Sequence, residues 1–553
     1  MRFVIALATL ALTACNAETP PEPVADAPAT LFFGGTVYTG VEAERPANGV
    51  LVDGDGRIET VYFDPPPEEV FQRANLGRVD LAGATLFPGF VDAHAHLLGI
   101  GERELYFDLT GTASVAELVS KVEAEVAKAA PGEVIYGDGW IETGWPEGRM
   151  PVARDLDAVS PDNPVILERA DGHAMVVNTA ALDAAGIDFD TLDPSGGMIE
   201  RTDDGRATGI LVDYAMSLVR PLIAEPTEQD LIAGYSMASD VYTARGWTGL
   251  HNMSVNPDHA PMLERLSLED RLELRLHNAF DAAGFDIAIE RRHETPRITN
   301  RAVKLYMDGA LGSRGAQLTA PYADRPDTSG LSLTDDEKLA EHMRRASDQN
   351  VQLAIHAIGD LANKRILDAF EAQFGGSAAG VRWRIEHTQI LRPQDIERVA
   401  GLGLIASMQP SHAIGDLYFA PARIGIDRLR GGYAWDSLID AGAIIAGGSD
   451  APVEVGSPTI EFYAAVARKG LDGFQDEGWY PEEAVSRENA LKMFTYWPAY
   501  AAFMEDDLGT IEAGKLADFT VFDRDLMTIP EADILDAKPV MTVVGGEIVW
   551  RAE

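Results

Sequence analysis

The sequence predicts an α/β protein. We expect a (β/α)8 TIM barrel, a small β-sandwich domain built from both chain ends, and a large insertion after the first barrel strand. Short β-type runs with Gly and Asp-Gly turns occupy both ends of the chain, and apolar runs alternate with helical segments between them. When eight barrel strands have been assigned, one long segment, about 100–245, remains, and we interpret it as the insertion. A chain of 553 residues is long enough for a barrel with a satellite domain.

The first 14 residues have the pattern of an export signal. Arg2 precedes an apolar run, Phe3 to Leu12, that is too short to span a bilayer as a helix. The run ends in LTAC, which resembles a bacterial lipobox, and Cys15 is the only cysteine. We therefore expect an exported lipoprotein, lipidated at Cys15 and held in the periplasm or at the outer membrane. Residues 15–30, rich in Pro, Ala and Glu, should form an extended tether.

Residues 31–86 and 504–553 should form one composite β domain. The first segment contains LFFGGTVYTG, GVLVDGDGRIETVYF and RVDLAGATLF, and the second contains LADFTVFD and MTVVGGEIVWR. Neither set has enough strands to cover its own apolar face, so we expect the two sets to pack together.

Residues 87–503 should form the barrel. The predicted strands are 86–96, 247–253, 271–278, 301–308, 351–357, 382–388, 403–409 and 443–450. The remaining segment, about 100–245, follows the first strand. We expect it to lie at the mouth formed by the carboxyl ends of the strands, where it can cover a site.

Two histidines end the first predicted strand. His94 and His96 lie two residues apart in PGFVDAHAHL, residues 88–97, so on a strand both side chains leave the same face. Such a pair can chelate a metal ion. Two hydrogen-bonded core histidines would give the same pattern, and the pair alone does not decide between these readings.

Other candidate ligands also lie at or near predicted strand ends. His356 ends QLAIH, His387 ends RWRIEH, Asp450 ends IIAGGSD, and Lys304 lies within AVKLYMDG. The carboxyl ends of parallel barrel strands converge on one mouth, so these side chains should surround one site. The alternative for Lys304 is a surface lysine on a helix, with its charged end in solvent.

These motifs resemble the amidohydrolase superfamily, specifically the amidohydrolase-3 branch that includes N-substituted formamide deformylases. The resemblance extends from Leu31 to the end and includes KLYMDGALGSRGA, QPSH, GGSDAPVE and GTIEAGKLADFTVFD. It implies two divalent metal ions, one held by His94, His96 and Asp450 and the other by His356 and His387, with a carboxylated Lys304 bridging both. Histidine and carboxylate ligands suit Zn²⁺, and the same ligand types also fit Mn²⁺, Fe²⁺ or Co²⁺.

The resemblance also implies a mechanism. A water that bridges two divalent ions loses its proton near neutral pH, and the resulting hydroxide attacks the substrate carbonyl. Asp450 is then the expected catalytic proton shuttle. His173 in DGHAM and His412 in QPSH resemble substrate-lining positions, although a structural histidine that caps a loop is an open alternative for each. Arg314 in the glycine-rich loop DGALGSRGA, which lacks a P-loop ending, could bind an anionic substrate group or face solvent.

The expected function is metal-dependent hydrolysis of a non-peptide C–N bond in an amide, formamide or cyclic amide. The alternatives are an esterase, lactonase or dipeptidase that uses the same site, and a non-catalytic ligand-binding lipoprotein. The formal net charge of −43 argues against nucleic-acid binding, which needs Lys and Arg clusters. The expected partners are a small-molecule substrate and, through the lipid anchor only, a membrane; a homo-oligomer remains open.

Overall fold

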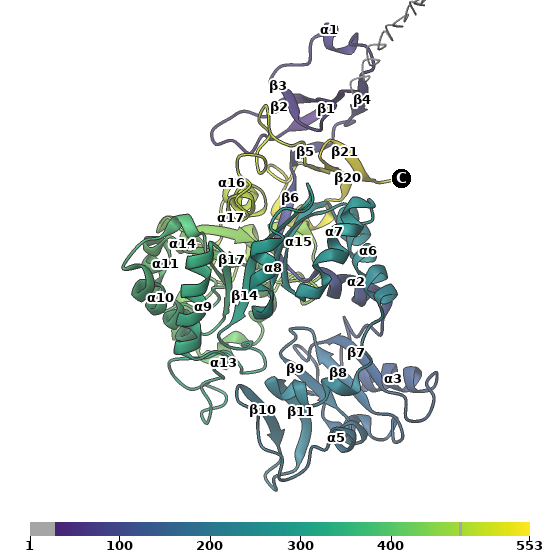
Figure 1. Cartoon of the computed structure of the whole chain (residues 1–553), viewed down its shortest axis with the longest axis vertical. Helices are drawn as coiled ribbons and strands as arrows, with labels where there is room; N and C mark the ends of the chain where they lie inside the picture. The colour runs from purple at the N-terminus through teal and green to yellow at the C-terminus, as the bar shows by residue number, and fades with distance from the viewer. Residues whose placement is uncertain (1–27, 475–477) are drawn as a thin grey trace, which may run out of the picture.

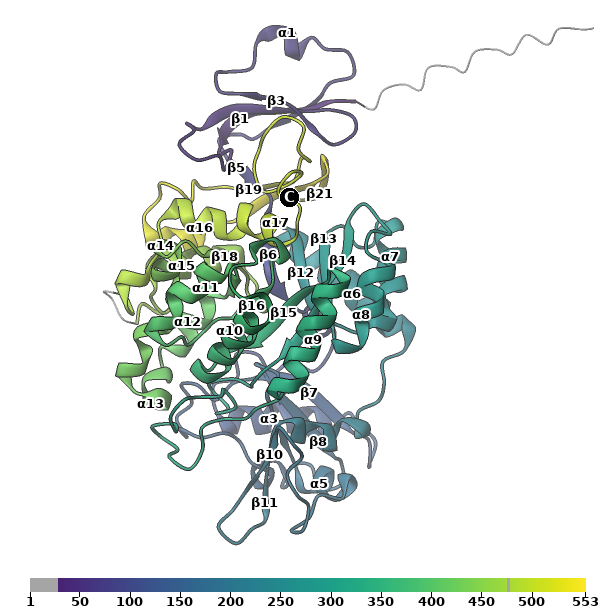
Figure 2. The same cartoon turned by 60° about the vertical axis from the view of Figure 1, so that its left-hand side comes forward.

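The computed structural model describes residues 28–474 and 478–553, which form three β-sheets with their helices. The predicted export signal, Cys15 and the tether up to residue 27 lie outside these residues. Figures 1 and 2 show the barrel in the middle of the molecule, a sheet from both chain ends on one side and a third sheet on the other. Over the described ranges, no helix combines the length and apolar character needed to cross a bilayer.

The central sheet is the predicted barrel. Its neighbours in space follow the chain order: β6 (Phe90–Ala95), β12 (Trp247–Val255), β13 (Arg275–Phe280), β14 (Ile298–Tyr306), β15 (Gln352–Ala357), β16 (Arg384–His387), β17 (Ile405–Met408) and β18 (Ile444–Gly447). All paired neighbours are parallel. Beyond the last strand, Asp450 N donates to His94 O at 2.6 Å and His96 N donates to Ala451 O at 2.8 Å. These bonds join the first and last strands, so the sheet is a nearly closed TIM barrel.

Helices surround the barrel: α2 (Leu97–Leu105), α6 (Glu228–Arg245), α7 (Ala260–Leu268), α8 (Phe285–Glu290), α9 (Asp336–Gln349), α10 (Asp360–Phe374), α11 (Ile396–Leu402), α12 (Pro410–Asp416), α13 (Ala420–Ile424), α14 (Trp435–Asp440), α15 (Pro458–Ala467), α16 (Arg487–Phe494) and α17 (Tyr496–Ala501). Local chemistry sets their ends. Thr227 and Asp230 form a capping box at the start of α6, which ends at Gly246 with φ 97°. Apolar side chains between strands and helices, such as Leu353 and Phe370, are fully buried in one large core.

Strands from both chain ends share the second sheet. It contains β1 (Thr30–Val37), β2 (Ala47–Val52), β3 (Ile58–Tyr62), β4 (Gly77–Asp80), β5 (Thr85–Pro88), β19 (Phe519–Phe522), β20 (Pro539–Val544) and β21 (Glu547–Arg551), with α1 (Glu68–Phe71) after β3. Leu86 of β5 pairs with Val521 of β19 in an antiparallel ladder. Phe32 and Phe519, one from each chain end, pack edge to face in its core. The arrangement as a sandwich stays a prediction.

Gly89 separates the two sheets. The sequence predicts one strand over 86–96, but the structure ends β5 at Pro88 in the terminal sheet and begins β6 at Phe90 in the barrel. Gly89 N donates to Asp518 O at 2.8 Å, and a Cβ atom here would lie 2.3 Å from Oγ1 of Thr248. The chain needs glycine where it crosses between two closely packed sheets.

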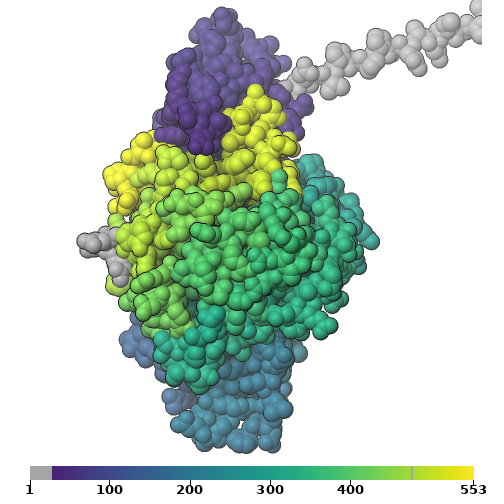
Figure 3. All heavy atoms as spheres, turned by 90° about the vertical axis from the view of Figure 1, so that its left-hand side faces the viewer, coloured from purple at the N-terminus to yellow at the C-terminus, as the bar shows by residue number. Residues whose placement is uncertain are grey.

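The chain between β6 and β12 forms the third sheet, in the order β10 (Gly197–Arg201), β11 (Ala207–Asp213), β9 (Ala174–Val177), β8 (Val165–Arg169) and β7 (Ile135–Trp140). The helices α3 (Val115–Val126), α4 (Ala153–Leu156) and α5 (Thr179–Ala185) accompany it. Its buried apolar side chains form clusters of their own. Figure 3 shows this segment, in blue, packed against the green barrel.

Candidate active site

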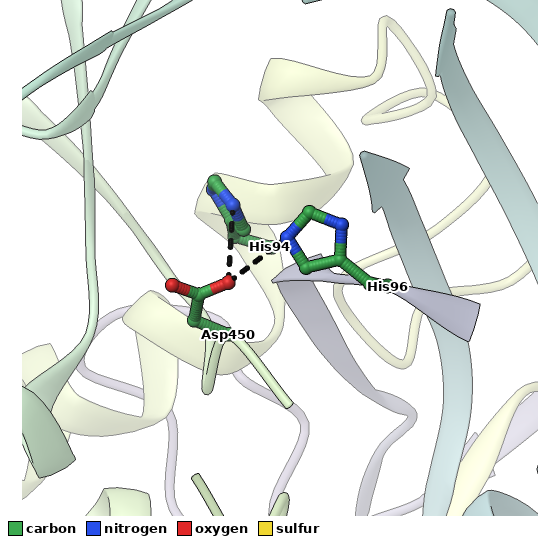
Figure 4. Close-up of side chains that lie close together, drawn as sticks. All are labelled: His94, His96 and Asp450. Carbon is green, nitrogen blue, oxygen red and sulfur yellow. Dashed lines mark ion pairs between the residues drawn. The ribbon is translucent and has the colours of Figure 1, made fainter. Parts of the chain in front are cut away.

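One carboxylate faces four imidazole rings at the mouth of the barrel. Asp450 Oδ1 lies 3.4 Å from Nε2 of His94 and 3.2 Å from Nε2 of His96. Figure 4 shows the carboxylate turned toward both rings, with the two pairs marked by dashed lines. Its other oxygen, Oδ2, lies 3.7 Å from Nε2 of His412 and 4.0 Å from Nδ1 of His387. The four histidines come from the ends of β6 and β16 and from α12, and Asp450 follows β18. Strand ends far apart in the sequence therefore meet at one point.

Lys304 and His356 complete this group. Lys304 Nζ lies 3.3 Å from Nε2 of His94, and the side chain is buried. The His356 ring centroid lies 4.5 Å from that of His387. In the β14–β15 register Tyr306 pairs with His356, so Lys304, two residues earlier, leaves the same face of the sheet. The structure thus brings all six predicted ligand residues together.

The backbone is unusual at two members of the group. His387 has a φ of 72° and Asp450 a φ of 62°, in the left-handed region that non-glycine residues rarely adopt. Both residues lie where a barrel strand ends. Such conformations cost free energy and concentrate at functional sites, where packing fixes them.

The protonation states of the group suit metal coordination. Burial lowers the pKa of His94 to about 4 and holds the pKa values of His356 and His387 well below their usual range. Burial also lowers the pKa of Lys304 to about 8. Burial would raise the pKa of Asp450, but the facing imidazoles of His94, His96 and His387 outweigh it and hold that pKa well below its usual value. His94, His356 and His387 therefore offer neutral imidazoles and Asp450 offers an ionised carboxylate, which are the forms that bind metals.

Unpaired buried atoms show that a cation fits here. Nε2 of His356, Nε2 of His412 and Oδ1 of Asp450 are buried without a hydrogen-bond partner among the described residues. Folded proteins pair nearly all such atoms, and these three carry lone pairs that a divalent cation would accept. Two sets of atoms lie within 4.8 Å of one another: His94, His96 and Asp450, and His387, His412 and Asp450. His412, predicted to line the substrate site, therefore also lies among the candidate ligands.

The insertion supplies a further histidine. The ring centroid of His173, between β8 and β9, lies 5.1 Å from that of His356, and its Nδ1 lies 2.6 Å from Oδ1 of Asp213 at the end of β11. Burial lowers the pKa of His173, but the hydrogen bond and charge of Asp213 outweigh burial and raise the pKa to about 9. A cationic imidazole therefore borders the cluster, while the role of His173 toward a substrate stays a prediction.

The glycine-rich loop after β14 surrounds Asp213. A Cβ atom at Gly309 or Gly315 would lie 2.4 or 2.5 Å from Oδ2 of Asp213. These glycines thus let the insertion approach the barrel closely. Arg314, on the same loop, donates from Nη2 to Oδ2 of Asp324 at 2.8 Å, and Arg423 binds the same oxygen. The guanidinium of Arg314 is thus bound by the carboxylate of Asp324. Among the contacts of the described residues, none joins Arg314 to the cluster.

Sequence reasoning missed the residues that support the candidate ligands. Glu386 binds Nδ1 of His94 at 2.6 Å, and Gln409 Oε1 lies 2.8 Å from Nδ1 of His387. Asp308 is fully buried, lies 3.6 Å from Nε2 of His356 and accepts bonds from three backbone N–H groups. Alternation in the run RWRIEH could have indicated that Glu386 faces the barrel interior. Asp213 carried no comparable signal, because its partner is 40 residues away.

The family model described as the amidohydrolase family matches residues 78–550 of this chain. The chain belongs to the amidohydrolase family. The predicted resemblance to this superfamily is therefore confirmed.

Full-length relatives of this amidohydrolase agree with the match. The protein YtcJ of Bacillus subtilis (strain 168) is 32% identical over 527 residues, which cover 94% of this chain and 99% of YtcJ. An N-substituted formamide deformylase of Arthrobacter pascens is 28% identical over 535 residues, which cover 91% of this chain and 95% of that enzyme. Among solved structures, an uncharacterized metal-dependent hydrolase from Pyrococcus horikoshii OT3 has 28% sequence identity and a TM-score of 0.73, with 91% of this chain and 99% of that chain covered.

Proposed function

We propose that this amidohydrolase is a metal-dependent hydrolase of a non-peptide C–N bond in an amide, formamide or cyclic amide. The observation that carries the proposal is the buried cluster around Asp450, in which three imidazole and carboxylate atoms have no hydrogen-bond partner among the described residues. The solved relative from Pyrococcus horikoshii is described as a metal-dependent hydrolase, and the Arthrobacter pascens relative is a formamide deformylase. Both names support hydrolysis, and the second supports the C–N bond.

We assign His94, His96 and Asp450 to one divalent ion, and His356 and His387 to a second. Lys304 would bridge the two as a carbamate, because a charged ammonium buried among cations is opposed both by desolvation and by repulsion. His412 is available to the second ion or to the substrate. Nitrogen and carboxylate ligands favour Zn²⁺.

Divalent ions bound there would polarise a substrate carbonyl and lower the pKa of water. The protein's own groups would perform the remaining steps. Asp450 can accept the proton of the attacking water and return it to the departing amine, which is a poor leaving group without it. The His173 imidazolium, held by Asp213, can donate a hydrogen bond to negative charge that develops on the carbonyl oxygen.

A substrate panel on metal-loaded protein tests the proposal. N-formyl amines, N-acyl amines and cyclic amides would be assayed beside lactones, aryl esters and dipeptides, with Zn²⁺, Mn²⁺ or Co²⁺ supplied. We expect the highest kcat/KM among the amides. Higher kcat/KM for lactones or dipeptides would reassign the bond that is cleaved, and purified protein that holds no divalent metal would contradict the metal site itself.

A further inference from the structure

A charged pair lies inside the barrel beneath the cluster. Arg384 and Glu386, two residues apart on β16, are both fully buried and point to the same face. The interior of a TIM barrel is usually filled by layers of apolar side chains. A buried ion pair is costly unless its hydrogen bonds are well satisfied, so its presence at this point needs an explanation.

Glu386 joins this pair to a candidate ligand. Its Oε2 accepts a hydrogen bond from Nδ1 of His94 at 2.6 Å. Arg384 donates from Nε to Oε1 at 2.7 Å and from Nη2 to Oε2 at 3.0 Å. Both carboxylate oxygens of Glu386 are therefore engaged, one of them by the guanidinium and the imidazole together.

Arg384 is itself fixed by neighbouring strands. Its Nη2 donates to Ala93 O of β6 at 2.6 Å and to Ser407 Oγ of β17 at 2.7 Å. Its Nη1 donates to Nδ1 of His251 on β12 at 2.6 Å. The guanidinium thus links four barrel strands and binds the residue immediately before His94. The carboxylate of Glu386 has little freedom to move.

We infer that Glu386 is a positioning residue for the metal centre, which holds the His94 ring in one orientation and in the tautomer that carries its proton on Nδ1. This inference rests on the proposed metal site. With the proton on Nδ1, the lone pair of Nε2 faces Lys304 Nζ at 3.3 Å and Asp450 Oδ1 at 3.4 Å. That is the side of the ring on which the other candidate ligands lie. A carboxylate behind a ligand histidine also increases its basicity.

A glutamine cannot replace this carboxylate. Both neighbours of the side chain, Nδ1–H of His94 and the Arg384 guanidinium, are donors. A glutamine has one acceptor oxygen and would direct its NH₂ group at one of these donors. Glu386→Gln therefore keeps the volume of the side chain and removes the ability to satisfy both partners.

The test measures Zn²⁺ affinity directly, by competition with a chelating dye, in full-length wild-type and Glu386→Gln protein. Loss of such a supporting partner typically weakens metal binding or activity about 10–100-fold, and we expect a dissociation constant raised by that factor. The matched control is Asp395→Asn, which alters another buried carboxylate bound by arginines, Arg392 and Arg398, away from the cluster. It should leave the Zn²⁺ affinity unchanged.

The inference is overturned if Glu386→Gln folds and keeps the wild-type Zn²⁺ affinity. It is also overturned if Asp395→Asn loses as much Zn²⁺ affinity as Glu386→Gln. A second measurement requires no Glu386 variant. It records ¹⁵N NMR spectra of metal-free wild-type protein with ¹⁵N-labelled histidine. The His94 signal is identified because it is missing from the spectrum of His94→Gln. We expect the Nδ1–H tautomer, and the Nε2–H tautomer would overturn the inference. If the wild type does not bind Zn²⁺, Mn²⁺ or Co²⁺, the proposed function is overturned as well. If the wild type binds metal but Glu386→Gln binds it equally well, only the role of Glu386 is overturned and the proposed function stands.

Discussion

The two sides of the candidate site are built in different ways. The barrel side takes its side chains from the ends of hydrogen-bonded parallel strands, where the register fixes the level of each residue. The insertion side takes His173 from a loop, and Asp213 binds its ring. Gly309 and Gly315 of the barrel lie against Asp213, where a larger residue would clash. The comparison teaches that the proposed metal ligands and His173, the proposed substrate contact, are held by separate parts of the fold. Changes on one side should therefore leave the other side's properties intact.

The largest effect should come from Asp450→Asn, on the barrel side. Asparagine keeps the size and one oxygen ligand but cannot accept a proton, so amide turnover should fall by about 10² to 10⁴. The loss should be larger for amides than for matched aryl esters, whose leaving groups need no proton. The measurement is kcat for both substrates, with metal content quantified. Near-normal amide turnover by metal-replete Asp450→Asn would leave Asp450 as a ligand only.

Lys304→Ala should remove both metal and activity, because the side chain proposed to carry the bridging carbamate is lost. We expect more than about a 100-fold loss of activity, beyond that for a supporting residue, and partial recovery with a small carboxylic acid. Lys364→Ala, which alters a half-buried lysine paired with Asp368, is the control. Full activity and metal content in Lys304→Ala would end the bridging role.

His173→Asn tests the insertion side. Loss of a donor to developing negative charge typically lowers kcat about 10²- to 10³-fold, and the Zn²⁺ affinity should stay at the wild-type value. His342→Asn, on α9 beside Phe285, is a control remote from the cluster. A fall in metal affinity in His173→Asn would break the proposed separation of the two sides.

The His173–Asp213 pair should also make stability depend on pH. Its partner raises the pKa of His173 from 6.5 to about 9, so the stabilisation is complete below pH 6.5 and is lost as the pH rises through about 9. The difference in unfolding free energy between wild type and Asp213→Asn should thus decline over this window, by on the order of 3 kcal/mol. Denaturant titrations at a series of pH values measure it, and a constant difference would contradict a charged His173.

Cys15→Ser should alter neither side of the site. We expect unchanged kcat and Zn²⁺ affinity, and release of the protein from the membrane fraction, because the predicted lipid anchor is lost. Fractionation after a high-salt wash, beside the wild type, measures this. Equal membrane retention of the variant would refute the anchor.

On the barrel side the sequence predicts the candidate ligands, whereas on the insertion side it predicts His173 but not its partner Asp213. Strand periodicity and strand-final polar residues were sufficient to locate the eight strands and to bring His356, His387 and Asp450 to one mouth. Pro88-Gly89 signals the break at which the chain enters the barrel, but the predicted strand 86–96 still runs across it, because an apolar run does not show where one strand ends and the next begins. Arg314 was assigned to an anionic substrate because its partner Asp324 lies in an irregular loop, whose side-chain directions follow no period.

The pairing of β5 with β19 in the terminal sheet affects the order in which the chain can fold during synthesis. β5 has its antiparallel partner in β19, close to the opposite end of the chain. During synthesis the edge of β5 therefore stays without that partner until residues 519–522 have been made, and unpaired strand edges invite association with other chains. Contacts of such long sequence separation also form late, because a long loop must close first. The terminal sheet can therefore be completed only after residues 519–522 have been made. A chain cut short before β19 would lack the strand that pairs with β5, which leads into the first barrel strand.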